Sequence, residues 1–228
     1  MKAKKPLLSK QHVKQHYEFA VKYQHWTEED WFRVIFSDET KINCLGSDGR
    51  VWVWKKPGAG LTQQHVSGTV KFGGGSLMVW GCMTAHGVGY MCRIDGRMDG
   101  ELYREIMEDH LFQTVDYYGM DRERFVFQQD NDPKHTSRVA QGWFMENQVE
   151  VLDWPAQSPD LNPIEHLWWH LKKRLGTYPQ DPKSILELWE RVEAEWEKIP
   201  KEVCLDLIKS MPRRVAAVLK AKGGYTKY

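Results

Sequence analysis

Residues 32–39 read FRVIFSDE, a short apolar run that ends in polar residues. Val34, Ile35 and Phe36 follow one another directly, and an apolar run of this length is typical of a buried strand. We expect the strand to end at Ser37 and Asp38, so that Asp38 lies just beyond it. A carboxylate at the end of a buried strand is well placed for a ligand site.

The segments around this strand alternate between strand and helix patterns. On either side of a turn at 46–49, residues 41–46 and 51–56 suggest a hairpin. Further strands are expected at 76–83, 88–94, 124–129 and 149–154. Helices are expected at 9–25, 99–116, from a cap at Asp132 to 146, at 163–175, and in two C-terminal stretches, the second bent at Pro212. This order predicts an α/β fold, a mixed sheet with helices on both faces and additional helices at the C-terminal end.

Composition sets broad limits on this chain of 228 residues. Its hydrophobic content of 41% supports one sizeable core, and its charged content of 28% fits a folded protein. The net charge of +1 does not by itself indicate a nucleic-acid-binding protein. Basic residues gather near both ends and at 172–174, where solvated surface is the simpler interpretation.

Cysteine spacing and hydropathy exclude several other classes. The chain contains four cysteines, and their spacing fits neither a zinc ribbon nor a disulfide scaffold, so we expect reduced thiols. No segment approaches the roughly 18 apolar residues of a membrane span, and no secretory signal pattern is present. We therefore expect no membrane partner.

Three segments concentrate acidic residues near predicted strand ends. They are FSDET (36–40), QQDNDPKHTS (128–137) and DWPAQSPDLNPIEHLW (153–168). Asp130 follows the strand at 124–129, and Glu165 lies in the first turn of a helix that follows the strand at 149–154. Asp38, Asp130 and Glu165 are thus able to converge at one edge of the sheet.

Each acidic residue has an ordinary explanation when taken alone. Asp38 suits a turn between strands, and a helix dipole favours Glu165 in a first turn. Asp132 beside Pro133 is better explained as a helix cap, which leaves Asp130 as the functional candidate. In the loop 158–163, two prolines restrict the backbone before Glu165 and stiffen the start of its helix.

Together, the three segments resemble the catalytic motifs of the Tc/mariner superfamily of DNA transposases. The 34 residues between Asp130 and Glu165 match the Tc branch, and the resemblance covers nearly the whole chain. It implies a ribonuclease-H-like fold and an Asp-Asp-Glu site made of Asp38, Asp130 and Glu165. It also implies cut-and-paste transposition, in which DNA is hydrolysed at transposon ends and joined to target DNA.

Such a site implies two Mg²⁺ ions, with Mn²⁺ able to substitute. Carboxylates are the ligands that Mg²⁺ prefers, and paired ions suit phosphodiester hydrolysis. Two like charges about 4 Å apart cost on the order of 4 kcal/mol at an effective dielectric of about 20, so a cluster of carboxylates favours a bound cation. We expect Asp38 to bridge both ions, with Asp130 on one and Glu165 on the other. Secondary candidates are His135, His166 and Asn131.

The resemblance also divides the chain. Residues 1–25 correspond to an interdomain linker and helix, and residues 26–228 to the catalytic domain. Residues 57–75 correspond to a clamp loop, with a plain surface loop as the alternative. Family members carry a helix-turn-helix DNA-binding domain before this region, and we expect that domain to be absent from this chain.

The implied partners are DNA, both transposon ends and target, and a second copy of the chain in a synaptic homodimer. The implied location is the nucleus. One alternative is a catalytically silent, transposase-derived module for DNA binding or dimerisation. Another is a different nuclease of the same fold, against which the SPDLNPIEHLW segment (158–168) argues.

Overall fold

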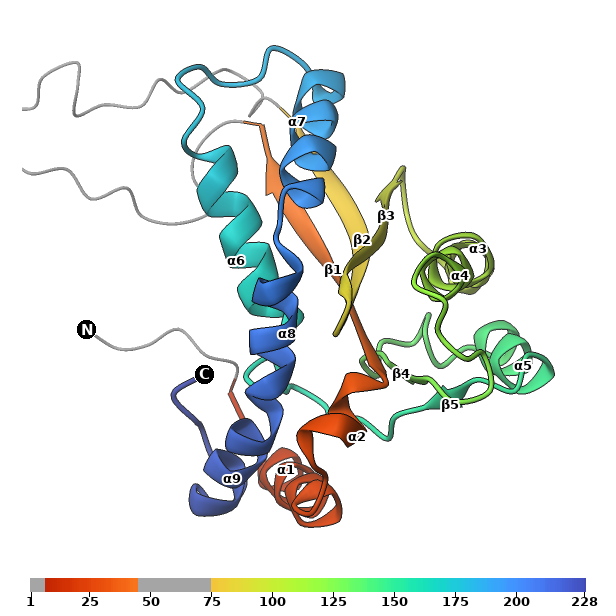
Figure 1. The fold of residues 1–228 in the computed structure, drawn as a ribbon, viewed down its shortest axis with the longest axis vertical. Coiled ribbons are helices and arrows are strands. Elements are labelled where there is room, and N and C mark those ends of the chain that lie inside the picture. The colour runs from red at the N-terminus through yellow and green to blue at the C-terminus, as the bar shows by residue number, and fades with distance from the viewer. Residues whose placement is uncertain (1–6, 45–74) are drawn as a thin grey trace, which may run out of the picture.

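A computed structural model describes residues 7–44 and 75–228 of the chain. In these residues, five strands form one mixed sheet in the order β3-β2-β1-β4-β5 (Figure 1). The strands are β1 (Val34–Asn43), β2 (Ser76–Thr84), β3 (Gly87–Ile94), β4 (Val126–Gln128) and β5 (Glu150–Val151). Strands β1, β2 and β3 form an antiparallel meander, whereas β4 and β5 run parallel to β1.

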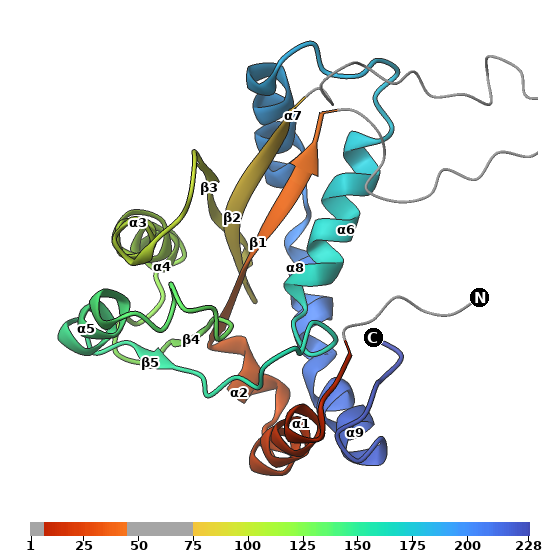
Figure 2. The ribbon, with the colours of Figure 1, turned by 180° about the vertical axis from the view of Figure 1, so that it is seen from behind.

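Helices cover both faces of the sheet (Figures 1 and 2). One face carries α1 (Lys10–Tyr23), α2 (Glu28–Phe32), α6 (Ile164–Leu175), α7 (Ile185–Glu197), α8 (Lys201–Lys209) and α9 (Met211–Lys220). The other carries α3 (Gly100–Ile106), a π-helical turn (Met107–Leu111), α4 (Phe112–Tyr117) and α5 (Arg138–Glu146). The prediction of a mixed sheet between two helical layers is confirmed.

The alternation of side chains along β1 supplies both cores. Val34 and Phe36 pack into the cluster shared with α1, α2 and α6–α9, while Ile35 packs into the cluster shared with α3–α5. Successive residues of a strand point to opposite faces, so a strand covered on both sides is apolar at every position. The run at 34–36 therefore forms the centre of the sheet.

The predicted end of the first strand was wrong. Strand β1 continues for ten residues to Asn43, and Asp38 lies in its middle, paired in register with Gly81 of β2. The polar residues Ser37 to Thr40 do not end the strand because β2 supplies an antiparallel hydrogen-bonding partner along this whole length. Asp38 is thus held by a sheet rather than by a turn.

The predicted helix start at Asp132 was also wrong. Residues 133–136 form turns, and α5 begins at Arg138 with Ser137 as its cap, because the Ser137 side chain accepts a hydrogen bond from the Ala140 N–H. Asp132 instead accepts a hydrogen bond from the Lys134 backbone N–H. Both Asp and Ser suit either role, and the pattern alone did not distinguish them.

The remaining predictions hold with local changes. Ser9 caps α1 as expected, and the helix expected at 99–116 contains the π-helical turn. The last predicted helix is two helices, α8 and α9, which meet at Ser210, two residues before Pro212. The turn at 46–49, the strand at 51–56 and all but the last residue of the clamp-loop segment 57–75 lie outside the described residues.

No helix in the described parts of the chain is long and apolar enough to cross a membrane. All four cysteines are free thiols.

Candidate active site

Asp38 lies in the centre of β1 on the face covered by α6. It is half-buried, and its Oδ1 accepts a hydrogen bond of 2.8 Å from the Glu39 backbone N–H. Its carboxyl group lies beside that of Glu165. Burial raises the pKa of Asp38 well above its usual range, and the neighbouring acids Glu165, Glu39 and Asp130 raise it further. Asp38 in the central strand therefore lies near other acidic side chains.

Glu165 is directed at Asp38 by the loop that precedes α6. The Asn162 side-chain amide donates to the Ser37 backbone carbonyl at 3.2 Å, which ties this loop to β1 next to Asp38. Pro163 stands at the helix start as expected, although Asn162 makes only a long contact of 3.4 Å to the Ile164 N–H. The Glu165 side chain reaches solvent, but desolvation by its neighbours raises its pKa. Lys172 and the interaction with Asp38 oppose this rise.

Asp130 lies two residues beyond β4, and its side chain is 55% exposed. It accepts hydrogen bonds from the backbone N–H of Asp132 at 2.9 Å and from His135 Nδ1 at 2.6 Å. Burial alone would raise the pKa of Asp130, but these hydrogen bonds lower it. Asp130 is therefore ionised and paired with His135.

His135 bridges two carboxylates. Its Nδ1 contacts Asp130, its Nε2 lies 3.1 Å from Glu39 Oε1, and its ring packs on Tyr103 with centroids 4.2 Å apart. Burial would lower the pKa of His135, but the hydrogen bonds to Asp130 and Glu39 raise it to about 9. The imidazolium is thus present at neutral pH and holds Asp130 in place.

Sequence reasoning missed Glu39 and Lys134. Lys134 Nζ lies 3.7 Å from Glu39 Oε2 and 2.8 Å from Asp132 Oδ2, so Glu39 meets two cationic side chains. If residues 36–40 are placed within a strand rather than at its end, Asp38 and Glu39 are expected to point to opposite faces of the sheet. Glu39 would then have been expected to have partners of its own.

The other secondary candidates make structural contacts. The Asn131 side-chain amide donates to the Trp154 backbone carbonyl at 2.7 Å. His166 Nδ1 accepts a hydrogen bond of 3.1 Å from Arg214. Neither residue contacts the carboxylates of Asp38 or Asp130 through these bonds.

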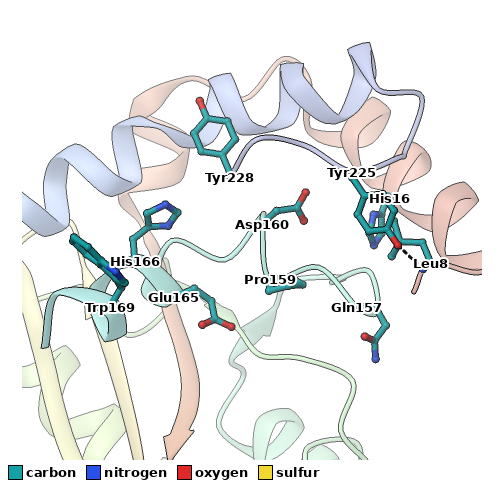
Figure 3. A pocket seen from close by; sticks show the side chains of 10 residues that line it. All are labelled: Leu8, His16, Gln157, Pro159, Asp160, Glu165, His166, Trp169, Tyr225 and Tyr228. Atoms are coloured by element: carbon teal, nitrogen blue, oxygen red, sulfur yellow. Dashed lines mark hydrogen bonds between the residues drawn. The ribbon is translucent and has the colours of Figure 1, made fainter. Parts of the chain in front are cut away.

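A cavity of about 540 Å³ adjoins Glu165 (Figure 3). Its lining includes His166 and Trp169 from α6, and Tyr225 and Tyr228 from the segment after α9. The Trp169 side chain is 56% exposed. The proposed catalytic glutamate thus stands at the edge of an open, largely aromatic hollow.

The structure brings Asp38 and Glu165 into contact, with Asp130 near enough to raise the pKa of Asp38. In residues 7–44 and 75–228, no three His, Cys, Asp or Glu side chains already stand at spacings that would hold a metal ion. The donors nevertheless fit Mg²⁺, since all three are carboxylates and two of them are drawn together against their repulsion.

Comparison with known proteins identifies the family of this chain. Residues 33–185, about two thirds of the chain, match the DDE superfamily endonuclease family. The chain belongs to the DDE superfamily of endonucleases. The matched residues include the central strand, the segment after β4 and all of α6.

Relatives place this DDE domain among the transposases. The chain is 43% identical over 229 residues to the transposable element Tc1 transposase of Caenorhabditis elegans, covering 99% of this chain and 81% of the relative. The Tcb1 transposase of Caenorhabditis briggsae is also 43% identical, over 225 residues, with coverage of 99% and 81%.

A solved structure agrees on the fold of the DDE domain. The Mos1 transposase paired-end complex with left transposon end superposes with a TM-score of 0.85 at 20% identity, covering 100% of this chain and 67% of that one. The fold is ribonuclease-H-like, as predicted. The DDE domain is the DNA-cleaving catalytic domain of a Tc1-like transposase, and the alternative of a silent module is not favoured.

Proposed function

We propose that Asp38, Asp130 and Glu165 hold two Mg²⁺ ions with which this domain hydrolyses DNA at transposon ends and joins the ends to target DNA. The observation that carries the proposal is the contact between the carboxyl groups of Asp38 and Glu165, which come from β1 and α6. Two acids held together at the centre of a sheet favour cation binding, because a cation removes their mutual repulsion.

The three carboxylates would differ in how many of the two ions they bind. Asp38 lies between the other two acids in the fold and would bridge both ions, with Asp130 on one and Glu165 on the other. Bound Mg²⁺ supplies charge stabilisation and a water activated at neutral pH. Mos1 catalytic-domain structures with Mg and with Mn have been solved, which supports a divalent-metal site on this fold.

His135 has a supporting role in this proposal. Its hydrogen bond to Asp130 restrains a largely exposed side chain, and its second bond to Glu39 anchors the imidazole to β1. A restrained ligand loses less conformational freedom when an ion binds. Asp130 is thereby oriented by the protein before any metal arrives.

DNA as the partner follows from the same family membership. The Mos1 structure that superposes on this chain is a complex with a transposon end. A homodimer in the synaptic complex, a nuclear location and the division at residues 25 and 26 belong to the proposal and extend the resemblance to the transposases.

Manganese binding measured by calorimetry tests the metal site. We expect the wild-type protein to bind Mn²⁺ and Asp130→Asn to bind it at least about tenfold more weakly, because one carboxylate ligand is lost. Asp132→Asn is the matched control, since Asp132 lies two residues away and pairs with Lys134. We expect it to bind as the wild type does.

Equal binding by the wild type and Asp130→Asn would remove Asp130 from the site. If neither protein binds Mn²⁺ alone, the titration is repeated with a duplex that carries a transposon end. Continued absence of binding would then refute the metal assignment.

A further inference from the structure

Arg214 is a charged residue in the interior of the molecule. Its side chain in α9 is 1% exposed, whereas the neighbouring Arg213 is exposed. Burial lowers the pKa of Arg214 to about 10, so the guanidinium remains charged at neutral pH. Removing a charge from water is unfavourable unless the site compensates it, so a buried arginine indicates a specific role for its contacts.

Three hydrogen bonds and one ring contact hold Arg214. Its Nε donates to Ser210 Oγ at 2.8 Å, and one terminal nitrogen donates to the Asp160 backbone carbonyl at 2.7 Å. The other terminal nitrogen lies 3.1 Å from His166 Nδ1. The guanidinium carbon Cζ lies 4.7 Å from the centroid of the Tyr228 ring. The three hydrogen bonds end on uncharged acceptors, which makes them contacts that position neighbours rather than ion pairs.

Two of these acceptors lie on either side of Glu165 in the chain. Asp160 is in the stiff loop that leads into α6, and His166 directly follows Glu165 in the first turn. Figure 3 shows Asp160, Glu165 and His166 together along the wall of the cavity. Because Arg214 donates only, His166 Nδ1 is the acceptor and its imidazole is fixed in one tautomer. One planar guanidinium thus restrains the chain both before and after the glutamate.

Other contacts fix the remainder of the same loop. Ser158 Oγ bonds to His16 of α1 at 2.8 Å, and Asn162 bonds to the Ser37 carbonyl of β1. Arg214 supplies the restraint from α9. Among the described residues, these contacts attach the loop to α1, β1 and α9, and Thr226 of the C-terminal segment also donates to Asp160 Oδ2 at 2.7 Å. The attachment by Arg214 also reaches the first turn of α6.

We propose that Arg214 is a positioning residue for the cleavage reaction, which sets the direction of Glu165 through the Asp160 carbonyl and His166. The inference rests on the proposed function, in which Glu165 is a metal ligand. Errors of about 1 Å in the placement of reacting groups cost on the order of 10²-fold in rate. Loss of Arg214 therefore lowers the rate of chemistry more than it weakens DNA binding.

The first experiment compares two adjacent arginines. Steady-state cleavage of a duplex with a transposon end is measured for wild type, Arg214→Met, Arg214→Lys and Arg213→Met, with the melting temperature of each. We expect Arg214→Met to lower kcat on the order of 10²-fold with KM changed by less than about threefold. Arg214→Lys should recover part of the loss, since lysine restores one donor and the charge, and Arg213→Met should keep kcat.

The second experiment tests the route to Glu165 without removing the buried charge. His166→Ala should lower kcat at nearly constant KM, and the exposed His170→Ala should not. The double variant Arg214→Met with His166→Ala should be no slower than Arg214→Met alone, because both changes break the same connection. This comparison remains decisive even if Arg214→Met lowers the melting temperature.

The outcomes separate this inference from the proposed function. If the wild type cleaves DNA while Arg214→Met or His166→Ala keeps kcat within about threefold, Arg214 has a structural role only and the inference is overturned. Fully additive losses in the double variant overturn the route through His166. Failure of the wild type to cleave with any divalent metal refutes the proposed function instead.

Discussion

The two faces of the central strand place two neighbouring carboxyl groups in opposite electrostatic environments. Asp38 points to the α6 face, where it meets another acid, Glu165. Glu39 points to the α5 face, where it meets His135 at 3.1 Å and Lys134 at 3.7 Å. The strand geometry guarantees the opposite directions, since side chains alternate along a strand.

The difference distinguishes a structural acid, Glu39, from the proposed metal ligand, Asp38. On the α5 face the protein supplies cations, so Glu39 joins the turn at 133–136 to the sheet. On the α6 face, burial and the neighbouring Glu165 carboxyl group raise the pKa of Asp38. A site that the protein fills with like charge favours a cation from solution.

The largest expected effect is at Asp38. Asp38→Asn should lower the rate of DNA cleavage by roughly 10³-fold or more, because the bridging metal ligand is lost. Its free energy of unfolding should not fall, since the repulsion from Glu165 is removed. Single-turnover cleavage and urea denaturation check the two statements. If Asp38→Asn cleaves DNA within tenfold of the wild-type rate, the proposed difference between the two faces is contradicted.

A second paired acid, Glu195 in α7, gives an intermediate effect that depends on pH. Hydrogen bonds from Lys198 and Arg174 lower the pKa of Glu195 to about 2, below its ordinary value of 4.5. A lowered folded-state pKa stabilises the protein above the unfolded pKa, and this stability is lost as the pH falls from about 5 towards 2. We expect the contribution to be on the order of 2–3 kcal/mol.

The Glu195 prediction is checked by urea denaturation at several pH values between 3 and 7. Glu195→Gln should show a shallower loss of stability in acid than the wild type. Glu190→Gln, an exposed neighbour in α7, should behave as the wild type does. Parallel curves for all three proteins would mean that Glu195 is not paired in solution.

The smallest expected effect is at Glu39. Glu39→Gln should lower the free energy of unfolding by about 1–2 kcal/mol, because His135 and Lys134 lose a charged partner but glutamine keeps one acceptor. The exposed Glu150→Gln should change it by less than about 0.5 kcal/mol. Denaturation in urea measures both. If the free energy of unfolding of Glu39→Gln did not fall, as is expected for Asp38→Asn, the two faces would not differ.

Much of the fold could be predicted because its signals are local. The apolar run at 34–36, the cap at Ser9 and the prolines around 158–163 act over a few residues, and each predicted the element that the structure shows. The end of one strand and the start of one helix were misjudged, because residues that suit a strand end or a helix cap also suit other positions. Strand β1 continues through polar residues because β2 pairs with it, and Ser137 rather than Asp132 caps α5.

The candidate site divides in the same way. The three acids were selected from the order and spacing of their motifs, which needs no knowledge of contacts. Asp38 lies beside Glu165, 127 positions away in the chain, and His135 bridges to Glu39, 96 positions away. The spacing of motifs along the chain can indicate such residues, but only tertiary packing determines which side chains they contact.

The sequence by itself determined the fold class, the catalytic motifs and the stiff approach to Glu165, because periodicity, capping and proline geometry are properties of short segments. Only the tertiary structure decided that Asp38 lies within a strand, that Glu39 is neutralised from the opposite face and that Arg214 is buried while Arg213 is exposed. Those outcomes depend on which distant elements remove a side chain from water. Burial and charge pairing are long-range quantities, and no local pattern encodes them.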